Sequence, residues 1–281
     1  MLRVWELPRS TFYDRRGRAQ QPLLGARRRG MKTAWSDAER TEKIRAAIAA
    51  TPFHGEGHRQ VWARLRYAGV RSSRGRVLRW MCEAELLAPA RGPQRVSVNP
   101  HAGTIVTEEP NPMWGTDLTA TVTIEEGPVG VFVALDPCNA ECVGIPAAKP
   151  ATRLEVLEPL RQAVREVFGG FTAGVAAGIQ LRHDHGSRYR SDDFQAEIRF
   201  LGMESSPAFV RQPGGNGCVE RFLRTLKKQL LWVRTFRNLE ELRAALLEFQ
   251  ERYREHWLIE RNGFRSPRQV RRDFLALGAA A

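Results

Sequence analysis

The sequence has few cysteines and no long apolar run. Only 4 of its 281 residues are cysteine, and no two of them form a CxxC pair. This excludes a disulfide scaffold and an obvious zinc cluster, and it fits a reducing cytoplasm. No apolar run approaches the roughly 18 residues that a membrane span requires, and the N-terminus lacks the apolar stretch of a secretory signal. We therefore expect a cytoplasmic protein with no membrane partner.

Acidic residues are scarce in the first third of the chain. Residues 1–100 carry 21 Lys and Arg but only 8 Asp and Glu, whereas residues 101–281 carry 23 of each kind. The net charge of +13 therefore belongs to the first 100 residues. Basic side chains at this density gain free energy on a polyanion by releasing its condensed counterions. We expect nucleic acid as the partner, with an anionic membrane surface as the second candidate.

The basic part has the pattern of a helix-turn-helix module. Helices are predicted from Ser36 to Thr51, from His58 to Tyr67 and from a cap at Ser72 or Ser73 to Glu85, because serines cap helices and Pro52 ends one. In the last helix Val77, Leu78 and Met81 should face inward. The arginines then left for DNA are Arg74, Arg76 and Arg79. Such a helix suits DNA contact, although a solvated basic helix would show the same pattern.

Five prolines between residues 88 and 113 separate basic from neutral composition, and we place the domain boundary there. The predicted segments are a basic irregular arm at 1–35, a helix-turn-helix module at 36–90, a Pro-rich linker at 91–113, an α/β core at 114–272 and a C-terminal tail at 273–281.

After Trp114 the hydropathy alternates with a period of two, which predicts a strand. The apolar members of this alternation are Leu118, Ala120, Val122 and Ile124. Further strands are expected over 129–135, 141–145 and 179–184, with a short one around 204–206. The first three strands should be antiparallel, and the fourth should return parallel to the first by a crossover helix. These strands predict a mixed five-stranded sheet flanked by helices.

Four helices are expected around this sheet. A capping box at 152–155 opens the first, and Pro159 should kink it. Ser191 caps the second, and the last covers 239–257. The third, over 216–232, has an apolar stripe made of Val219, Phe222, Leu223, Leu226, Leu230 and Val233.

Three carboxylates are predicted to meet in this arrangement. Asp117 and Asp184 should lie on neighbouring strands, and Glu220, beside the apolar stripe, should reach them from a helix packed on the sheet. The alternative for Glu220 is a surface glutamate in ordinary helical ion pairs. Three further carboxylates are interpreted as structural because they end a strand or open a helix, namely Asp136, Asp192 and Asp193.

Three carboxylates in one place repel one another unless cations neutralise them. Oxygen-only ligation suits Mg²⁺ or Mn²⁺. Two such ions about 3.5 to 4 Å apart can activate an attacking oxygen and stabilise a leaving one at phosphorus. Basic residues on the same helix should hold the flanking DNA backbone, namely Arg221, Arg224, Lys227 and Lys228.

The motifs around these carboxylates resemble the DDE triad of retroviral-integrase-type transposases. They are WGTDLT at 114–119, HDHGSRYRS at 183–191 and NGCVERF at 216–222, with 35 residues between Asp184 and Glu220. The segment 58–89 resembles the helix-turn-helix that precedes this core in the second-reading-frame (OrfB) transposases of bacterial insertion sequences. The resemblance covers nearly the whole chain.

The resemblance implies an RNase H-like core whose catalytic and metal-binding residues are Asp117, Asp184 and Glu220. It implies Mg²⁺-dependent cleavage of double-stranded DNA at the ends of the element and transfer of the freed 3′-hydroxyl, without a covalent protein intermediate. It also implies a homo-oligomer on DNA at the bacterial nucleoid. The implied partner is the first-frame (OrfA) protein, joined by a programmed frameshift, which we expect this chain to lack.

The sequence departs from many relatives beside the second aspartate, where Arg182-His183 replaces His-Ser and Arg188 replaces Gln. These differences concern the surroundings of the triad and leave its three residues intact. Two other functions stay open. One is a non-catalytic DNA-binding regulator of transposition that uses the basic module, and the other is an RNA-cleaving nuclease of the same fold.

Overall fold

The computed structural model describes residues 11–13, 16–17, 35–88, 105–149, 157–208 and 216–280. Most of the predicted N-terminal arm and Pro-rich linker and the capping box at 152–155 lie outside these ranges. The chain divides into two units, Met1–Arg40 and Thr41–Ala281. Within the described ranges, no helix is both long and apolar enough to span a bilayer.

Three helices form the N-terminal helical module: α2 (Asp37–Ala49), α3 (His58–Tyr67) and α4 (Arg74–Glu83). Ser36 and Glu39 cap α2 reciprocally, because the Glu39 N–H donates to Ser36 Oγ at 3.3 Å and the Ser36 N–H donates to Glu39 Oε2 at 2.7 Å. Ser73 caps α4 by accepting the Arg76 N–H at 3.3 Å. The predicted helices of this module are therefore present.

The inward face of α4 differs from the prediction at one position. Val77 and Met81 are fully buried, but Leu78 is 39% exposed and Trp80 is 2% exposed. The prediction for Leu78 is wrong because the buried face is centred on Val77, between Trp80 and Met81, and Leu78 lies about 100° around the helix from Val77. Trp80 and Met81 complete that face.

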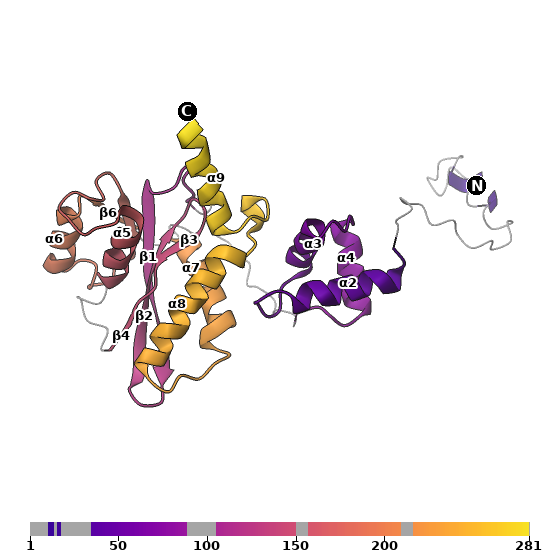
Figure 1. Ribbon diagram of the computed structural model, residues 1–281, viewed down its shortest axis with the longest axis horizontal. Coiled ribbons are helices and arrows are strands. Elements are labelled where there is room, and N and C mark those ends of the chain that lie inside the picture. The colour runs from indigo at the N-terminus through magenta and orange to yellow at the C-terminus, as the bar shows by residue number, and fades with distance from the viewer. Residues whose placement is uncertain are drawn as a thin grey trace, which may run out of the picture. The chain divides into compact units, whose positions relative to one another are not determined.

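The core is a mixed sheet in the order β3-β2-β1-β5-β6, with the short β4 also paired to β2 (Figure 1). The strands are β1 (Met113–Thr123), β2 (Gly127–Asp136), β3 (Glu141–Gly144), β4 (Ala147–Ala148), β5 (Gln180–His183) and β6 (Glu204–Pro207). β1, β2 and β3 are antiparallel, whereas β5 runs parallel to β1. The prediction that the strand at 179–184 pairs in parallel with the first strand is therefore confirmed.

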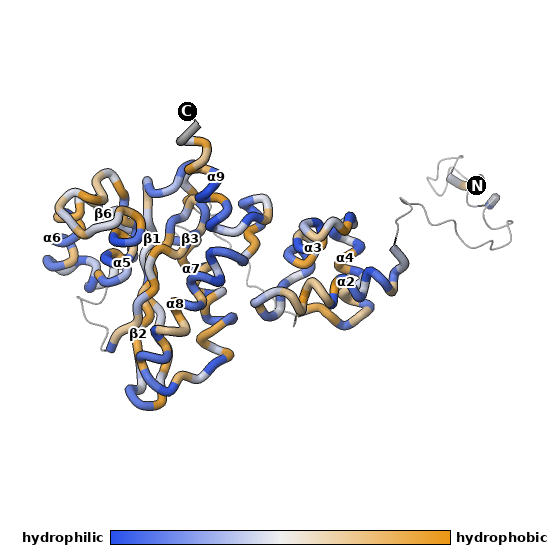
Figure 2. The backbone as a smooth tube through the Cα atoms, in the orientation of Figure 1, coloured by the Kyte–Doolittle hydropathy of each residue, from blue (hydrophilic) through white to orange (hydrophobic). Residues whose placement is uncertain are grey.

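Helices cover both faces of this sheet. α5 (Glu158–Phe168) and α6 (Asp192–Phe200) lie on one side, and α7 (Gly217–Leu226) and α8 (Leu239–His256) lie on the other. Each side has its own hydrophobic cluster, one around Trp114, Phe132 and Phe194 and the other around Phe222 and Phe249. Blue and orange bands alternate along these helices in Figure 2, as expected for helices with one face on a core.

Helix α5 is not kinked, contrary to the prediction. It begins at Glu158, so Pro159 lies in the first turn, where the missing N–H has no intrahelical partner to lose. The carbonyl oxygen of Pro159 packs against β3, 2.2 Å from the point that a Cβ on Gly144 would occupy. Glycine at that position therefore permits the close approach of α5 to the sheet.

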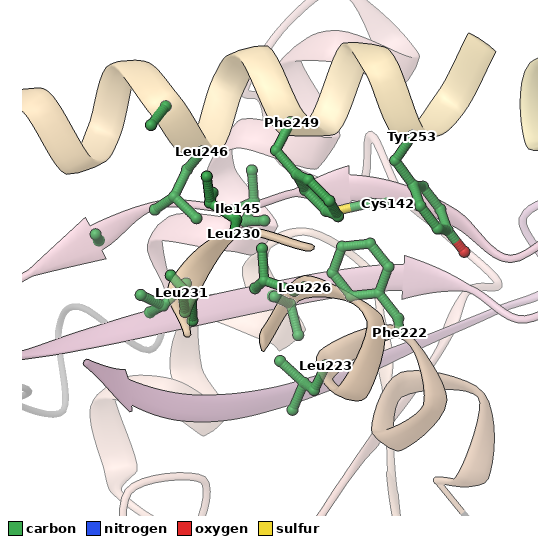
Figure 3. Packing of buried hydrophobic residues seen from close by; sticks show 14 of the residues in the cluster. Cys142, Ile145, Phe222, Leu223, Leu226, Leu230, Leu231, Leu246, Phe249 and Tyr253 are labelled. Atoms are coloured by element: carbon green, nitrogen blue, oxygen red, sulfur yellow. The ribbon is translucent and has the colours of Figure 1, made fainter. Parts of the chain in front are cut away.

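The apolar stripe of α7 buries the predicted residues except the last. Val219, Leu226 and Leu230 are at most 5% exposed, but Val233 is 59% exposed and Leu231 is 7% exposed. A π-helical turn, η1 (Lys227–Leu231), follows α7 directly. Because π-helical hydrogen bonds span five residues, this turn shifts the phase of the stripe and exchanges Leu231 for Val233. Figure 3 shows the leucines of α7 and η1 facing Leu246 and Phe249 of α8 over the strands.

In the second half of β1, and at the residue that follows it, two threonines are buried and the apolar side chains are exposed. Thr119 and Thr123 are 7% and 2% exposed, whereas Val122 and Ile124 are 63% and 70% exposed. Thr123 lies in a bridge with Phe236 and its hydroxyl donates to Glu126 at 2.8 Å. The hydropathy alternation thus located the strand but not the side that faces the core.

A buried ionic network joins the end of β2 to α9 (Pro267–Ala280), a helix that extends past the predicted boundary at residue 272. Asp136 is 0% exposed and accepts the N–H groups of Asn111 and Cys138, both at 2.9 Å. Arg271 of α9 binds Asp136 at 3.1 Å and also binds Glu141. The structural interpretation of Asp136 agrees with these contacts.

Gly115 of β1 faces α7 closely. A Cβ there would lie 2.6 Å from Val219 Cγ2 and 2.8 Å from Asn216 Oδ1. We expect Gly115→Ala to lower the free energy of unfolding by about 1 to 3 kcal/mol, the usual cost of overpacking, as measured by urea denaturation. Gly75→Ala is the matched control, because a Cβ on Gly75 in α4 would contact nothing within 4 Å and alanine favours helix by about 1 kcal/mol. Equal stability of the two variants would contradict this packing.

Burial raises the pKa of Asp136 to about 6, although Arg271 and two backbone N–H groups oppose the shift. The folded chain thus binds this proton more tightly than the unfolded chain, so folding gains stability as pH falls from about 6 to about 4. Relative to Asp136→Asn, we expect the wild-type free energy of unfolding to rise by up to about 3 kcal/mol between pH 7 and pH 4. Denaturation across this range, with exposed Glu240→Gln as control, checks the slope. A difference that does not vary with pH would contradict it.

Candidate active site

The register of the parallel strands brings Asp117 and Asp184 to the same level. Gly115 of β1 lies opposite Arg182 of β5. Continued by two residues, this register sets Asp117 beside Asp184, which directly follows the end of β5 at His183. Asp117, within β1, is half-buried, and Asp184 is exposed, so the two carboxyl groups lie side by side where β5 ends.

The turn after β5 is held by hydrogen bonds. The Gly186 N–H donates to Asp184 Oδ1 at 2.8 Å. The buried imidazole of His183 lies 2.7 Å from the Asp184 carbonyl oxygen and 2.9 Å from Ser205 Oγ of β6, and it stacks on Tyr189 at 5.1 Å. Burial lowers the pKa of His183, so the neutral ring is favoured and fixes the backbone beside Asp184.

The third carboxylate, that of Glu220, comes from α7, the helix that packs on β1. Asn216 precedes α7 and donates from Nδ2 to the Thr116 carbonyl oxygen of β1 at 3.0 Å. This bond and the close contact of Val219 with Gly115 hold the first turn of α7 on β1. Glu220, in that first turn, is exposed on the part of α7 that packs on β1 next to Asp117.

The pKa of Asp117 records the neighbouring charges. Burial is the main cause that raises it to about 6, and the N–H of Leu118, which donates at 2.7 Å, opposes burial. The carboxylates of Asp184 and Glu220 raise the pKa further, whereas Lys227 lowers it. Because such coupling weakens with distance, the structure brings the three predicted carboxylates and Lys227 into one region.

The three carboxylates do not yet surround a common point. In the part of the chain that the structure describes, no three His, Cys, Asp or Glu side chains are gathered closely enough to hold a metal ion. Asp117 and Asp184 instead each accept a backbone N–H, an arrangement in which like charges stay apart. The donor set still fits a hard divalent cation, because every donor is a carboxylate oxygen and the negative charges of Asp184 and Glu220 add to the burial that raises the pKa of Asp117.

The four residues of α7 and η1 that are predicted to contact DNA lie on two sides of the helix. Lys227 acts on Asp117, whereas three others, Arg221, Arg224 and Lys228, line a groove of about 960 Å³. In the described ranges none of these four cations has a carboxylate at ion-pair distance. They are free to bind an anion.

The predicted arginines of α4 have different surroundings. Arg74 binds Glu260 at 3.1 Å and its guanidinium lies 4.6 Å from the ring centre of Trp62. Arg79 lies 3.5 Å from Glu83 one turn on. Arg76 is half-buried. Of these three arginines, Arg76 alone has no ion-pair partner among the described residues. The role of α4 in DNA binding stays a prediction.

The order of strands, the parallel β1–β5 pair and the helices on both faces define an RNase H-like α/β core. Residues 201–258 match the family model described as "Integrase core domain". Over most of its length the chain is similar to "Transposase InsD for insertion element IS2A/D/F/H/I/K" of Escherichia coli, with 27% identity over 256 residues, 85% of this chain and 83% of that protein. "Transposase InsD for insertion element IS2D" of Escherichia coli (strain K12) gives the same values. These matches confirm the predicted resemblance to insertion-sequence transposases of the DDE group.

Two solved structures are also similar. One is the cryoEM structure of the simian T-cell lymphotropic virus intasome with the PP2A regulatory subunit B56 gamma, with 18% identity and a TM-score of 0.49, covering 75% of this chain and 70% of that one. The other is the HTLV-2 integrase catalytic core domain in complex with magnesium in its trimeric form, with 18% identity and a TM-score of 0.42, covering 58% of this chain and 97% of that one.

Sequence reasoning missed the positioning residues. Asn216 stands where a helix cap is expected, yet its side chain makes no cap and binds β1 instead. His183 appears in the quoted motif without a role, although it links Asp184 to β6. The available signals were two polar residues, His183 directly before Asp184 and Asn216 directly before α7.

Proposed function

We propose that this chain is a DNA transposase that cuts the ends of an insertion sequence and joins the freed 3′-hydroxyl to a target phosphodiester. The proposal rests on the strand register that sets Asp117 beside Asp184 and on the docking of α7, which carries Glu220, against β1 at Gly115 and Thr116. Two adjoining strands and a helix docked on the first of them supply this carboxylate set. The length of the similarity to insertion-element transposases supports the same activity.

The carboxylates of Asp117, Asp184 and Glu220 would hold two divalent cations, either Mg²⁺ or Mn²⁺. Such ions would polarise the phosphate and activate the attacking oxygen. The side chains contribute position and charge. Lys227, beside Asp117, would hold a DNA phosphate next to the carboxylates. The His183 bonds keep Asp184 in place, and the Asn216 bond keeps Glu220 in place.

The proposed partners are the DNA of the element ends, target DNA and the first-frame (OrfA) protein as a frameshift fusion. We also propose that the chain acts as a homo-oligomer on DNA. Both proposals rest on the similarity to insertion-element transposases.

The test is cleavage of labelled terminal-repeat DNA by the chain fused to its first-frame partner, with Mg²⁺. Asp117→Asn, Asp184→Asn and Glu220→Gln should each lower the rate by about 1,000-fold, since a bound divalent ion supplies several kcal/mol of transition-state stabilisation. Asp192→Asn is the matched control, because Asp192 only opens α6, and it should retain cleavage. Cleavage that survives in the three variants would refute the proposed role of these carboxylates, and absence of cleavage by the wild-type fusion would leave the non-catalytic regulator.

A further inference from the structure

The groove beside α7 has two walls from distant parts of the chain. One wall is α7 with η1, and the other is the segment 54–60, which leads into α3. The end of α8 and the loop 257–264 close it. The cavity, about 960 Å³, is large enough to take several atoms of a polymer backbone rather than a single ion.

Specific contacts hold the two walls together. The His54 N–H donates to Gln229 Oε1 at 2.9 Å, and Gln229 Nε2 donates back to the His54 carbonyl oxygen at 2.7 Å. Phe53 meets Trp257 edge to face with ring centres 4.9 Å apart. These contacts fix the segment before α3 against the core, so the groove is a built feature of the Thr41–Ala281 unit.

The lining of the groove is strongly cationic. Five Arg or Lys residues line it, namely Arg59, Arg221, Arg224, Lys228 and Arg261, against the single carboxylate of Glu260. That carboxylate is already shared by Arg59 at 2.8 Å and Arg74 at 3.1 Å. No acidic side chain of the lining is left to neutralise the cations of α7, which favours an anionic occupant.

A second cavity of the same unit, about 870 Å³ and lined by α5 and α8, provides a contrast. It too has arginines in its lining, but they are paired. Arg161 binds Glu197 at 2.6 Å, Arg243 binds Glu240 at 2.6 Å, and Arg165 lies 3.8 Å from Glu158. The arginines of this cavity are thus paired, whereas Arg221, Arg224 and Lys228 of the groove have no carboxylate at ion-pair distance among the described residues.

The groove also begins beside the carboxylates. Glu220 and Arg221 are consecutive on α7, and Lys227 acts on Asp117 while Lys228 lines the groove. A polyanion that passes from the carboxylate site along α7 would therefore enter the groove without leaving the helix. DNA fits this path, because its phosphates repeat along the strand and are read by cations without regard to sequence.

We propose that this groove binds the phosphodiester backbone of DNA leaving the carboxylate site, with the helical module supplying the second wall through Arg59. The proposal rests on the proposed transposase function for the identity of the polyanion. It assigns the helical module a DNA contact at the start of α3, in addition to any contact made by α4.

The test is fluorescence anisotropy of a 30-base-pair duplex and of one of its strands with the full chain, in EDTA, from 50 to 300 mM NaCl. The variant Arg59→Gln/Arg221→Gln/Lys228→Gln removes three proposed phosphate contacts. The slope of log affinity against log salt should fall by about 2.7 for duplex or about 2.1 for single strand. Whichever DNA shows the fall identifies the form of DNA that is bound.

The matched control is Arg165→Gln/Arg237→Gln/Arg272→Gln, which removes equal charge from side chains that do not line the groove; its slope should change by less than about 1. The charge-keeping variant Arg59→Lys/Arg221→Lys/Lys228→Arg should bind like wild type, which separates lost charge from misfolding. The proposal would be overturned if the slope fell equally in the Gln variant of the groove and in the control variant. A reduced slope in the charge-keeping variant would also overturn it.

The readout needs no catalysis, so the two proposals fail separately. A chain that binds through the groove but does not cut DNA would refute the transposase and keep the groove. A chain that cuts DNA while the groove variant binds unchanged would refute the groove and keep the transposase.

Discussion

The contact of α7 with β1 at Gly115 is the constraint on which the site depends. Because position 115 has no Cβ, Val219 and Asn216 reach the strand backbone, and Asn216 binds the Thr116 carbonyl oxygen. This contact brings Glu220 to the part of β1 that carries Asp117. The parallel pairing of β1 with β5 then adds Asp184. The hydrophobic cluster between α7, α8 and the sheet (Figure 3) holds the helix in that position.

The same contact sets the electrostatics of the molecule. It gathers negative charge at the place where β5 ends beside β1. There, burial and two neighbouring carboxylates raise the pKa of Asp117 to about 6. The cations that follow Glu220 on α7 supply positive charge beside it, some toward the carboxylates and some toward the groove. A site that attracts cations and a groove that attracts phosphates thus share one helix. This pairing is what chemistry on a nucleic acid backbone requires.

The sequence predicted the elements well because their signals are local. The alternation in β1, the serine caps at Ser73 and Ser191 and the stripe of α7 each depend on nearby residues. The errors arose where tertiary structure intervenes. The π-helical turn moved Val233 to the surface, and the start of α5 placed Pro159 in a first turn. The groove was beyond prediction, because Arg59 and Lys228 are distant in sequence and their proximity depends on the bonds between His54 and Gln229.

The central proposal is that Asp117, Asp184 and Glu220 share a cation site, although Asp117 and Asp184 each also accept a backbone N–H group. Anomalous X-ray diffraction at the manganese edge, from crystals soaked in Mn²⁺, tests this most directly. The account predicts a peak between Asp117 and Asp184 on the side facing Glu220, lost in crystals of Asp117→Asn. A peak elsewhere, or ordered crystals with none at this site, would contradict it.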